Sequence, residues 1–280
     1  MTEKETREYL EIELQKVKRW EKHQQDLPFW EKIGRLPFAL LDRLTPKFIQ
    51  DKLGKAIDEL GSYIQTGGQY LISEKSVLNV FRDVCRESAY EGVPPSSPEE
   101  IGNMPLSIQD QAASRLAESR KTFAAIQGAT TGFGGLFTLA ADVPALLGVT
   151  LKVIQETALC YGFDPREKKE RLFAVKCLQF SSSDIVGKRA ILGDLETFGE
   201  EPGHGRIVSE LQGWREVAAA YRDSFGWKKL FQAVPVAGML FGAYLNKGAV
   251  SDAAETAQML YRKRSILRKL ALADLRRQGI

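Results

Sequence analysis

The sequence predicts an all-α protein, a multi-helix bundle around a central glycine-rich apolar helical hairpin. Apolar residues recur at three- and four-residue steps along most of the chain, which is the period of an amphipathic helix. Alternating Val, Ile and Thr runs bounded by turns, the pattern of a half-buried strand, do not occur. Between Lys121 and Lys152 the chain carries one charged residue, Asp142, in a stretch rich in Gly, Ala and Thr. This stretch is either the buried centre of a helical domain or a segment that enters a membrane.

Length, composition and charge limit the class of protein. The 280 residues suffice to bury a core in one large domain or two small ones. Apolar residues at 44% and charged residues at 27% are average for soluble proteins, and the mean hydropathy of −0.24 argues against a polytopic membrane protein. The net charge is only +3, so the molecule as a whole is not a polyanion binder.

The cysteines and the N-terminal residues indicate the compartment. Cys85, Cys160 and Cys177 are odd in number and lack CxxC spacing, so we expect no disulfide framework and no metal site, and no cofactor is indicated. We interpret them as buried, reduced thiols. The first twenty residues alternate in charge and contain no apolar signal-peptide core, which predicts a cytoplasmic protein.

Residues 1–92 are expected to form an N-terminal helical region. A charged helix over 3–25 carries an apolar stripe made of Leu10, Leu14 and Val17. Thr45-Pro46 supplies an N-cap and a first-turn proline, so a second helix begins there and ends at Gly67-Gly68. A third amphipathic segment covers about 74–90.

A loop at 93–104, in the stretch rich in proline and serine, is expected to separate this region from a main helical body at 105–280. The first helix of the body, 105–131, is polar in its first half and apolar in its second. Gly132-Phe133-Gly134-Gly135 interrupts it, since each glycine lowers helix propensity by about 1 kcal/mol. The chain is therefore expected to turn back there as a hairpin.

Two aspartates precede expected helices. Asp142 lies two residues before Pro144, which suits the N-cap of a helix that ends at Gly162. The alternative for this residue is a buried carboxylate that binds a ligand or transfers a proton. Asp164 is expected to cap the following helix, with a proline in the first turn and Glu167 at the third helical position.

A second charge-free window, 230–246, contains a proline and two glycines four residues apart, Gly238 and Gly242. Gly128 and Gly132 have the same spacing in the first window. Small residues four apart allow two helices to approach closely, both in lipid and in a soluble core. The spacing predicts tight helix packing without deciding between these surroundings.

The first window does not support a stable membrane span. Residues 122–141 have the length of about 20 residues that a bilayer core requires, but the glycine cluster falls inside them. Large hydrophobes there would contribute about −2 to −4 kcal/mol on insertion, and Gln127, the threonines and the glycine backbone would oppose them. A hairpin bent at 132–135, either folded into the core or dipping into one leaflet, fits better.

The chain closes with a helix over about 250–278 in which leucines interleave with basic residues. Such a helix suits an anionic membrane surface, where each basic residue contributes about 1 kcal/mol. A solvated helix whose apolar stripe packs on the domain explains the pattern equally well. Nucleic acid is not expected as a partner, because no recognised binding module is present. The residues expected at the membrane surface are Arg262, Lys263, Arg264, Arg268 and Lys269.

The sequence contains no recognisable catalytic constellation. HExxH, GxxxxGK[ST] and GxSxG motifs are absent. Asp142 and Glu156 would share one helix face but lie about 21 Å apart at 1.5 Å per residue. The alternative function is a hydrolase of peptides or lipids that uses Asp142, Glu156, His204 or the Ser181–Ser183 cluster. It requires at least two of these groups within hydrogen-bond reach in a cleft.

Several short motifs occur in a recognisable order: Gly128, Gly132-Phe133-Gly134-Gly135, Asp142-Val143-Pro144, Tyr161-Gly162-Phe163-Asp164, Pro235-Val236-Ala237-Gly238 and Asn246. In order and spacing they resemble the EcsC family of bacteria, over about residues 28–266.

The resemblance implies a biological role for the protein but no specific chemical reaction. Members of that family are encoded beside the two components of an ABC-type exporter linked to protein secretion. We therefore expect a membrane-peripheral accessory or regulatory protein at the inner face of the cell membrane, with transporter subunits and anionic lipid as partners. No catalytic residue transfers. The positions expected to act as fold determinants and as a surface for a partner are Gly132, Gly134, Gly135, Asp142, Pro144, Tyr161, Asp164, Pro235, Gly238 and Asn246.

Overall fold

The computed structural model describes residues 5–25, 72–133, 136–183, 185–196 and 235–277. In these ranges all regular structure is helical and no strand occurs, so the all-α prediction is confirmed. The expected helices after Thr45 and after the 200–205 break lie outside the described residues. The helices are α1 (Arg7–Gln25), α4 (Glu74–Glu87), α5 (Pro98–Ile101), α6 (Leu106–Phe133), α7 (Leu136–Cys160), α8 (Lys168–Ser182), α9 (Ile185–Glu196) and α11 (Pro235–Arg277).

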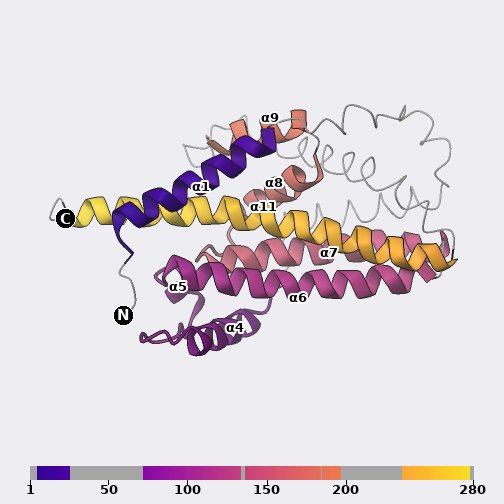
Figure 1. The fold of residues 1–280 in the computed structure, drawn as a ribbon, viewed down its shortest axis with the longest axis horizontal. Helices are drawn as coiled ribbons and strands as arrows, with labels where there is room; N and C mark the ends of the chain where they lie inside the picture. Colours follow the sequence, from indigo (N-terminus) through magenta and orange to yellow (C-terminus); the bar gives the residue numbers. More distant parts are fainter. Residues whose placement is uncertain (1–4, 26–71, 134–135, 184, 197–234, 278–280) are drawn as a thin grey trace.

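Helix α11 is the longest element and packs against α6, α7, α1 and α8. Figure 1 shows it running the length of the molecule, with α6 beneath it and α1 above. Its 43 residues correspond to about 64 Å. The predicted start of this helix near residue 250 was wrong: α11 runs without a break from Pro235 to Arg277 and so includes residues 235–246 of the charge-free window. Both halves of α11 pack on α6, as the contacts at Gly242 and Gln258 show.

Helices α6 and α11 meet through glycine. A Cβ atom added to Gly128 would lie 2.1 Å from the carbonyl oxygen of Gly242 and 2.9 Å from the side chain of Asn246. The two backbones are therefore in contact, which only glycine permits at this point. Residues along the pair show that the helices are antiparallel: Gly128 faces Gly242, and Ser114 accepts a hydrogen bond of 3.2 Å from Gln258.

Helices α6 and α7 also pack antiparallel, as expected for a hairpin (Figure 1). Their connection, Gly134-Gly135, lies outside the described residues. Helix α7 begins at Leu136, seven residues earlier than expected, and therefore contains both Asp142 and Pro144. The prediction of Asp142 as an N-cap was wrong, because its carboxylate is bound to neighbouring helices instead of to the helix start. No helix in the described part of the chain has the length and apolar character needed to cross a bilayer.

The end of α7 matches the prediction and the start of α8 does not. Gly162 has a φ of +73°, and the amides of Gly162 and Phe163 donate to the carbonyls of Leu159 and Ala158 at 2.9 and 3.0 Å, which is a Schellman C-cap. Helix α8 begins only at Lys168, so the capping role predicted for Asp164 was wrong. Asp164 instead accepts a hydrogen bond of 2.9 Å from the amide of Arg166 and closes the turn before the helix.

In the described part of residues 1–92, α1 and α4 pack on the body of the fold. Helix α4 matches the segment predicted at 74–90, and the Ser73 hydroxyl accepts from the Ser76 amide at 3.2 Å as its N-cap. It packs on α6 and α7, whereas α1 packs on α11 and α9. The expected loop at 93–104 contains the four-residue helix α5.

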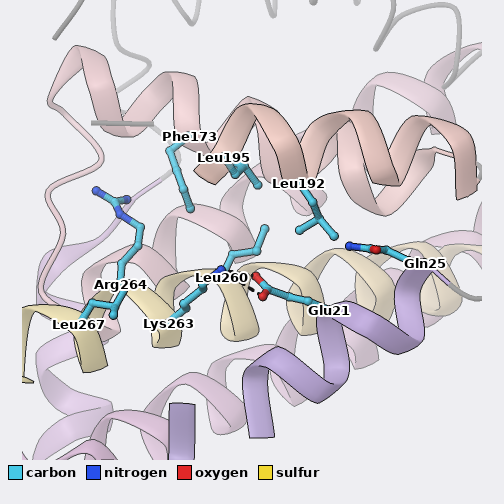
Figure 2. A pocket seen from close by; sticks show the side chains of 9 residues that line it. All are labelled: Glu21, Gln25, Phe173, Leu192, Leu195, Leu260, Lys263, Arg264 and Leu267. Atoms are coloured by element: carbon cyan, nitrogen blue, oxygen red, sulfur yellow. Dashed lines mark hydrogen bonds and ion pairs between the residues drawn. The ribbon is translucent and has the colours of Figure 1, made fainter. Parts of the chain in front are cut away.

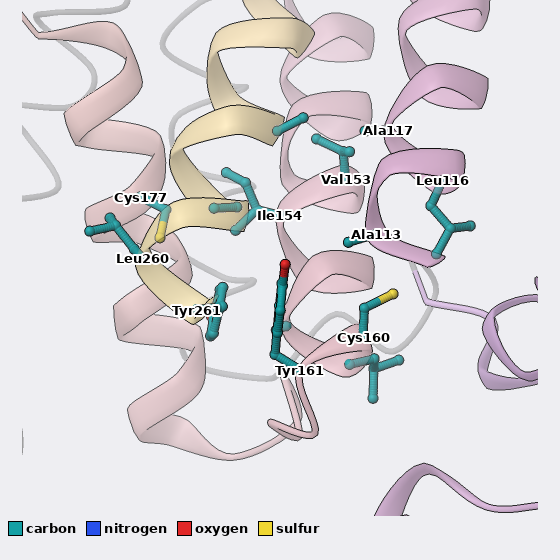
Figure 3. Close-up of a cluster of buried hydrophobic side chains, with 14 of the residues drawn as sticks. Ala113, Leu116, Ala117, Val153, Ile154, Cys160, Tyr161, Cys177, Leu260 and Tyr261 are labelled. Carbon is teal, nitrogen blue, oxygen red and sulfur yellow. The ribbon is translucent and has the colours of Figure 1, made fainter. Parts of the chain in front are cut away.

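The core lies where α6, α7, α8 and α11 meet, and its largest buried side chains are aromatic and branched aliphatic (Figure 3). Tyr161 and Tyr261 are fully buried, and small residues such as Ala113 on α6 make room for them. Cys85, Cys160 and Cys177 are free and buried, so the prediction of buried reduced thiols is confirmed. Burial raises the pKa of all three thiols, most strongly for Cys160 and Cys177.

We predict that Gly128→Ala destabilises the protein by about 1–3 kcal/mol, because the added methyl group collides with the backbone of α11. The control is Gly148→Ala in α7, where an added Cβ meets nothing within 4 Å. That change should be neutral or stabilising by up to about 1 kcal/mol. Urea denaturation followed by circular dichroism measures both. Equal stability of the two variants would contradict the glycine contact.

We also predict that the three thiols are unreactive in the folded protein at mildly alkaline pH. Raised pKa values reduce the thiolate fraction, and burial blocks the reagent. Labelling with an aromatic disulfide reagent should be slower by roughly a hundredfold than in denaturant, because it requires local or global opening. Rapid labelling of even one thiol under native conditions would contradict this packing.

Candidate functional site

A buried carboxylate lies beside the glycine contact of α6 and α11. Asp142 on α7 is fully buried, and its Oδ1 accepts hydrogen bonds from Asn246 Nδ2 at 3.0 Å, Thr131 Oγ1 at 2.9 Å and Gln127 Nε2 at 3.2 Å. We call these four residues the Asp142 cluster. Of the predicted site residues, the structure brings Asp142 and Asn246 together across 104 positions of sequence.

The Asp142 cluster joins three helices. Gln127 and Thr131 lie one turn apart on α6, and Asn246 lies on α11. Burying a carboxylate away from water is costly unless donors replace the lost hydration, and these three side chains supply such donors. The cluster therefore fixes α7 to the α6–α11 pair at the level of Gly128. Asp142 is a buried carboxylate, as the alternative interpretation of the sequence expected. Its hydrogen-bond donors are side chains of the protein itself.

A second buried carboxylate on α7 is held by cations. Glu156 is fully buried and receives both Nε and Nη2 of Arg120 at 2.7 Å, with Lys152 Nζ at 3.4 Å. The paired arrangement raises the pKa of Arg120 through its hydrogen bonds to Glu156. Glu156 thus ties α7 to α6 about four turns along α7 from Asp142.

The groups required by the hydrolase alternative have other partners. The hydroxyls of Ser181, Ser182 and Ser183 donate to backbone carbonyls of their own helix at 2.9, 2.8 and 2.6 Å. Asp142 receives its donors from α6 and α11, and Glu156 pairs with Arg120. His204 lies outside the described residues. None of these hydrogen bonds links two of the groups that a nucleophile-and-base arrangement needs.

Arg262, expected at a membrane surface, lies in a partly buried ionic cluster. Its guanidinium contacts Asp110 at 2.9 and 3.0 Å and Glu13 at 2.6 Å. Tyr161, another predicted site residue, donates to the same Asp110 carboxylate at 2.6 Å. Burial opposes the charge of Arg262, but hydrogen bonds and the charge of Asp110 raise its pKa. Burial and Asp110 also raise the pKa of Tyr161. The cluster joins α1, α6, α7 and α11.

Arg264 and Arg268 fill a second partly buried cluster. Arg264 forms two hydrogen bonds of 2.6 and 2.7 Å with the buried Glu170 of α8, and its guanidinium stacks over Phe163 at 4.1 Å and Phe173 at 4.3 Å. Arg268 donates to the carbonyls that end α7, those of Tyr161 at 2.7 Å and Gly162 at 3.0 Å. A cation at the C-terminus of a helix satisfies its last carbonyls and its dipole.

The two lysines of the predicted membrane-facing set are bound to α1 and to the residue Glu5 before it. Lys263 contacts Glu21 at 2.7 Å, and Lys269 contacts Glu5 and the carbonyl of Met104, both at 2.7 Å. All five cations therefore have partners inside the protein. A membrane contact through them stays a prediction, and in this conformation Arg262, Lys263, Arg264 and Lys269 are paired with carboxylates while Arg268 binds backbone carbonyls.

The remaining predicted positions in the described residues lie within helices or at their ends. Gly132 is buried near the end of α6, Pro144 lies within α7, Pro235 is the first residue of α11, and Gly238 follows it in the first turn. Proline at the first helical position loses no hydrogen bond. Gly134 and Gly135 lie outside the described residues.

Large apolar side chains are exposed on both sides of the glycine contact. Phe123 and Ile126 on α6 are 54% and 62% exposed, and Leu240 and Tyr244 on α11 are 74% and 76% exposed. The members of each pair lie three or four residues apart, so they share a face of their helix. We call these four residues the apolar end. Its exposure is unusual, because aromatic and aliphatic side chains of this size are normally buried in a soluble core.

The sequence matches the EcsC protein family over residues 11–266. The chain belongs to the EcsC family. The match begins within α1, earlier than the residue near 28 at which the motif resemblance starts. It therefore includes most of α1, the Asp142 cluster and the ion pairs of Glu156, Arg262 and Arg264, and it ends before Arg268 and Lys269.

Two relatives from Bacillus subtilis (strain 168) have similar sequences. The uncharacterized protein YdbA is 52% identical over 266 residues, which cover 95% of this chain and 96% of the relative. Protein EcsC is 30% identical over 166 residues, which cover 59% of this chain and 67% of the relative. No solved structure matches this chain.

The site that this EcsC-family chain presents is a set of buried polar junctions, together with an exposed apolar end. Within the described ranges no three His, Cys, Asp or Glu residues lie close enough to hold a metal ion. Sequence reasoning missed Gln127 and Thr131 as partners of Asp142, and Glu170 as the partner of Arg264. The sequence does show a polar residue on an otherwise apolar helix face, as at Asn246 and Glu170. Only the tertiary structure identifies the residue that binds it.

We predict that Asp142→Leu destabilises the protein by about 3 kcal/mol, because the buried Asn246 amide and the partly buried Gln127 and Thr131 side chains lose their acceptor. Asp142→Asn keeps an amide oxygen that accepts at the same place, so its loss should be only about 1–2 kcal/mol. Thermal denaturation of both variants measures the difference. If the leucine variant unfolds at the wild-type temperature, the cluster does not stabilise the helix junction.

Proposed function

We propose that this protein is a non-enzymatic, membrane-peripheral accessory protein that acts beside a membrane transporter. It works at the inner face of the cell membrane through its apolar end. The observation that carries this proposal is the exposure of Phe123, Ile126, Leu240 and Tyr244 on two helices that touch through glycine. Exposed apolar surface at one end of a bundle favours a lipid or protein partner over water.

The chemistry of the apolar end suits a bilayer. Tyrosine and phenylalanine partition to the membrane–water interface, where an apolar ring and a polar tip are both accommodated. The exposed Lys247 lies on the same stretch of α11, and a lysine side chain there can reach lipid headgroups while its stem covers apolar surface. The rigid glycine junction beneath keeps the four side chains in place without refolding.

Membership of the EcsC family suggests a transporter as the partner. Genes of the EcsC family stand beside those of an ABC-type exporter, and a peripheral protein that reaches the bilayer is suited to meet subunits embedded in it. Regulation of the transporter by contact, with no reaction at this protein, is consistent with clusters whose polar groups are used for helix packing.

We predict that replacing the apolar end by Phe123→Ser, Ile126→Ser, Leu240→Ser and Tyr244→Ser reduces binding to phosphatidylglycerol-containing vesicles at least about tenfold, because each exposed apolar side chain contributes about 1 kcal/mol or more on insertion. Flotation on a density gradient measures the bound fraction. The matched control is Ile12→Ser with Val93→Ser, which removes exposed apolar side chains elsewhere.

The control should float like wild type. If wild type and both variants stay at the bottom of the gradient, the apolar end does not bind lipid. A photo-crosslinker at position 126 or 244 in intact cells then decides whether a membrane protein is the partner. Crosslinks only to soluble proteins would overturn the proposal as a whole.

A further inference from the structure

We infer that the face of α11 beneath α1 is an anionic-lipid-binding surface, and that α1 covers it as a tethered competitor. This inference goes beyond the apolar end, which lies at the other end of α11. It concerns a second surface, formed by the last third of α11, and the condition under which that surface is available.

Three cations of this face already bind anions. Arg262 and Lys263 contact Glu13 and Glu21 of α1 at 2.6 and 2.7 Å, and Lys269 contacts Glu5, just before α1, at 2.7 Å. Helix α1 and the residues before it therefore present a row of carboxylates to a row of cations, the same charge complementarity that an anionic membrane surface would offer. We call Arg262, Lys263 and Lys269 the covered face.

Exposed leucines lie on the same part of α11 as the covered face. Leu267, Leu272 and Leu275 are 46%, 46% and 45% exposed and lie on the same stretch of α11. Basic residues interleaved with exposed leucines are typical of a helix that lies in the membrane interface. Nucleic acid would use the cations but gains nothing from three exposed leucines, so lipid is the partner that fits.

Both ion pairs and apolar contacts attach α1. Leu10, Leu14 and Val17 are buried, and the ring of Trp20 lies 5.7 Å from that of Phe180 of α8. Further contacts are polar: Trp20 donates to Glu255 at 2.6 Å and Lys188 of α9 donates to Gln24 at 2.7 Å. The side chains of the Glu21–Lys263 and Glu5–Lys269 pairs are 10–24% exposed, so competing anions reach them more readily than the Glu13–Arg262 pair, whose side chains are 7% and 11% exposed.

The last turns of α1 also lie over a cavity. A space of about 260 Å³ separates Glu21 and Gln25 of α1 from Leu192 and Leu195 of α9 (Figure 2). Figure 2 shows Glu21 directed to Lys263 at the edge of this space, with Leu260 and Leu267 of α11 below. Close packing is therefore missing where Glu21 pairs with Lys263, and this end of α1 is where displacement would begin.

The test weakens the ion pairs between α1 and the covered face and keeps α1 in the protein. Glu13→Gln with Glu21→Gln removes two carboxylates that bind the covered face, while Arg262 keeps Asp110. The matched control, Glu8→Gln with Glu11→Gln, changes the charge of α1 equally on its exposed side. Hydrogen exchange of α1 amides reports release, and sedimentation with sucrose-loaded vesicles reports binding.

We predict that the first pair of changes accelerates exchange in α1 and strengthens binding to phosphatidylglycerol-containing vesicles about tenfold, since each freed cation near an anionic surface raises partitioning by about fivefold. The control should behave as wild type, and vesicles of phosphatidylcholine alone should show no gain. The gain must persist when Phe123→Ser and Leu240→Ser are added, which separates this surface from the apolar end.

Three outcomes would overturn the inference. Unchanged exchange in α1 would show that the carboxylates do not hold it. Faster exchange without a gain in vesicle binding would show that the covered face does not bind lipid. A gain for a DNA duplex in place of vesicles would assign the surface to a different class of partner.

Discussion

The structure depends on one contact that has no side chain in it, the meeting of Gly128 and Gly242. Because two backbones touch there, the spacing and register of α6 and α11 are fixed within a fraction of a helical turn. The same register places Asp110 opposite Arg262, eighteen residues or about 27 Å further along α6. A methyl group at the glycine would therefore disturb pairings far from it, since both helices are rigid rods between the two points.

Polar groups in this protein are buried in matched sets. Asp142 has three neutral donors, Glu156 has Arg120, and Glu170 has Arg264 between two aromatic rings. A buried charge without a partner is far more costly than a missing apolar contact, so each set specifies one arrangement of the helices. Three carboxylates thus connect α7 and α8 to α6 and α11. Apolar packing alone would leave the register of these helices less defined.

The two ends of α11 differ in the surface they present. At its start, exposed aromatic and aliphatic side chains flank the glycine contact. Toward its end, cations face the carboxylates of α1 and exposed leucines lie beside them. One long helix thereby connects a constitutively exposed apolar surface to a basic surface whose charge is internally compensated. On the proposed function, these two surfaces would respond to two properties of a membrane, its apolar interior and its surface charge.

The sequence by itself determined the helical class, the amphipathic stripe of α1, the Schellman end of α7 at Gly162 and the buried state of the three thiols, because periodicity, glycine and cysteine usage act locally. It also marked Asp142 and Asn246 as polar residues in apolar windows. Only the tertiary structure decided that these two bind each other, that α7 starts before Asp142, and that Arg262 and Arg264 point into the protein. Capping rules consider only the end of a single helix. Here the Asp142 carboxylate is stabilised by hydrogen bonds from donors on two other helices instead. Whether a basic residue on a helix faces water or an acid depends on what packs against that face, and no local pattern contains that information.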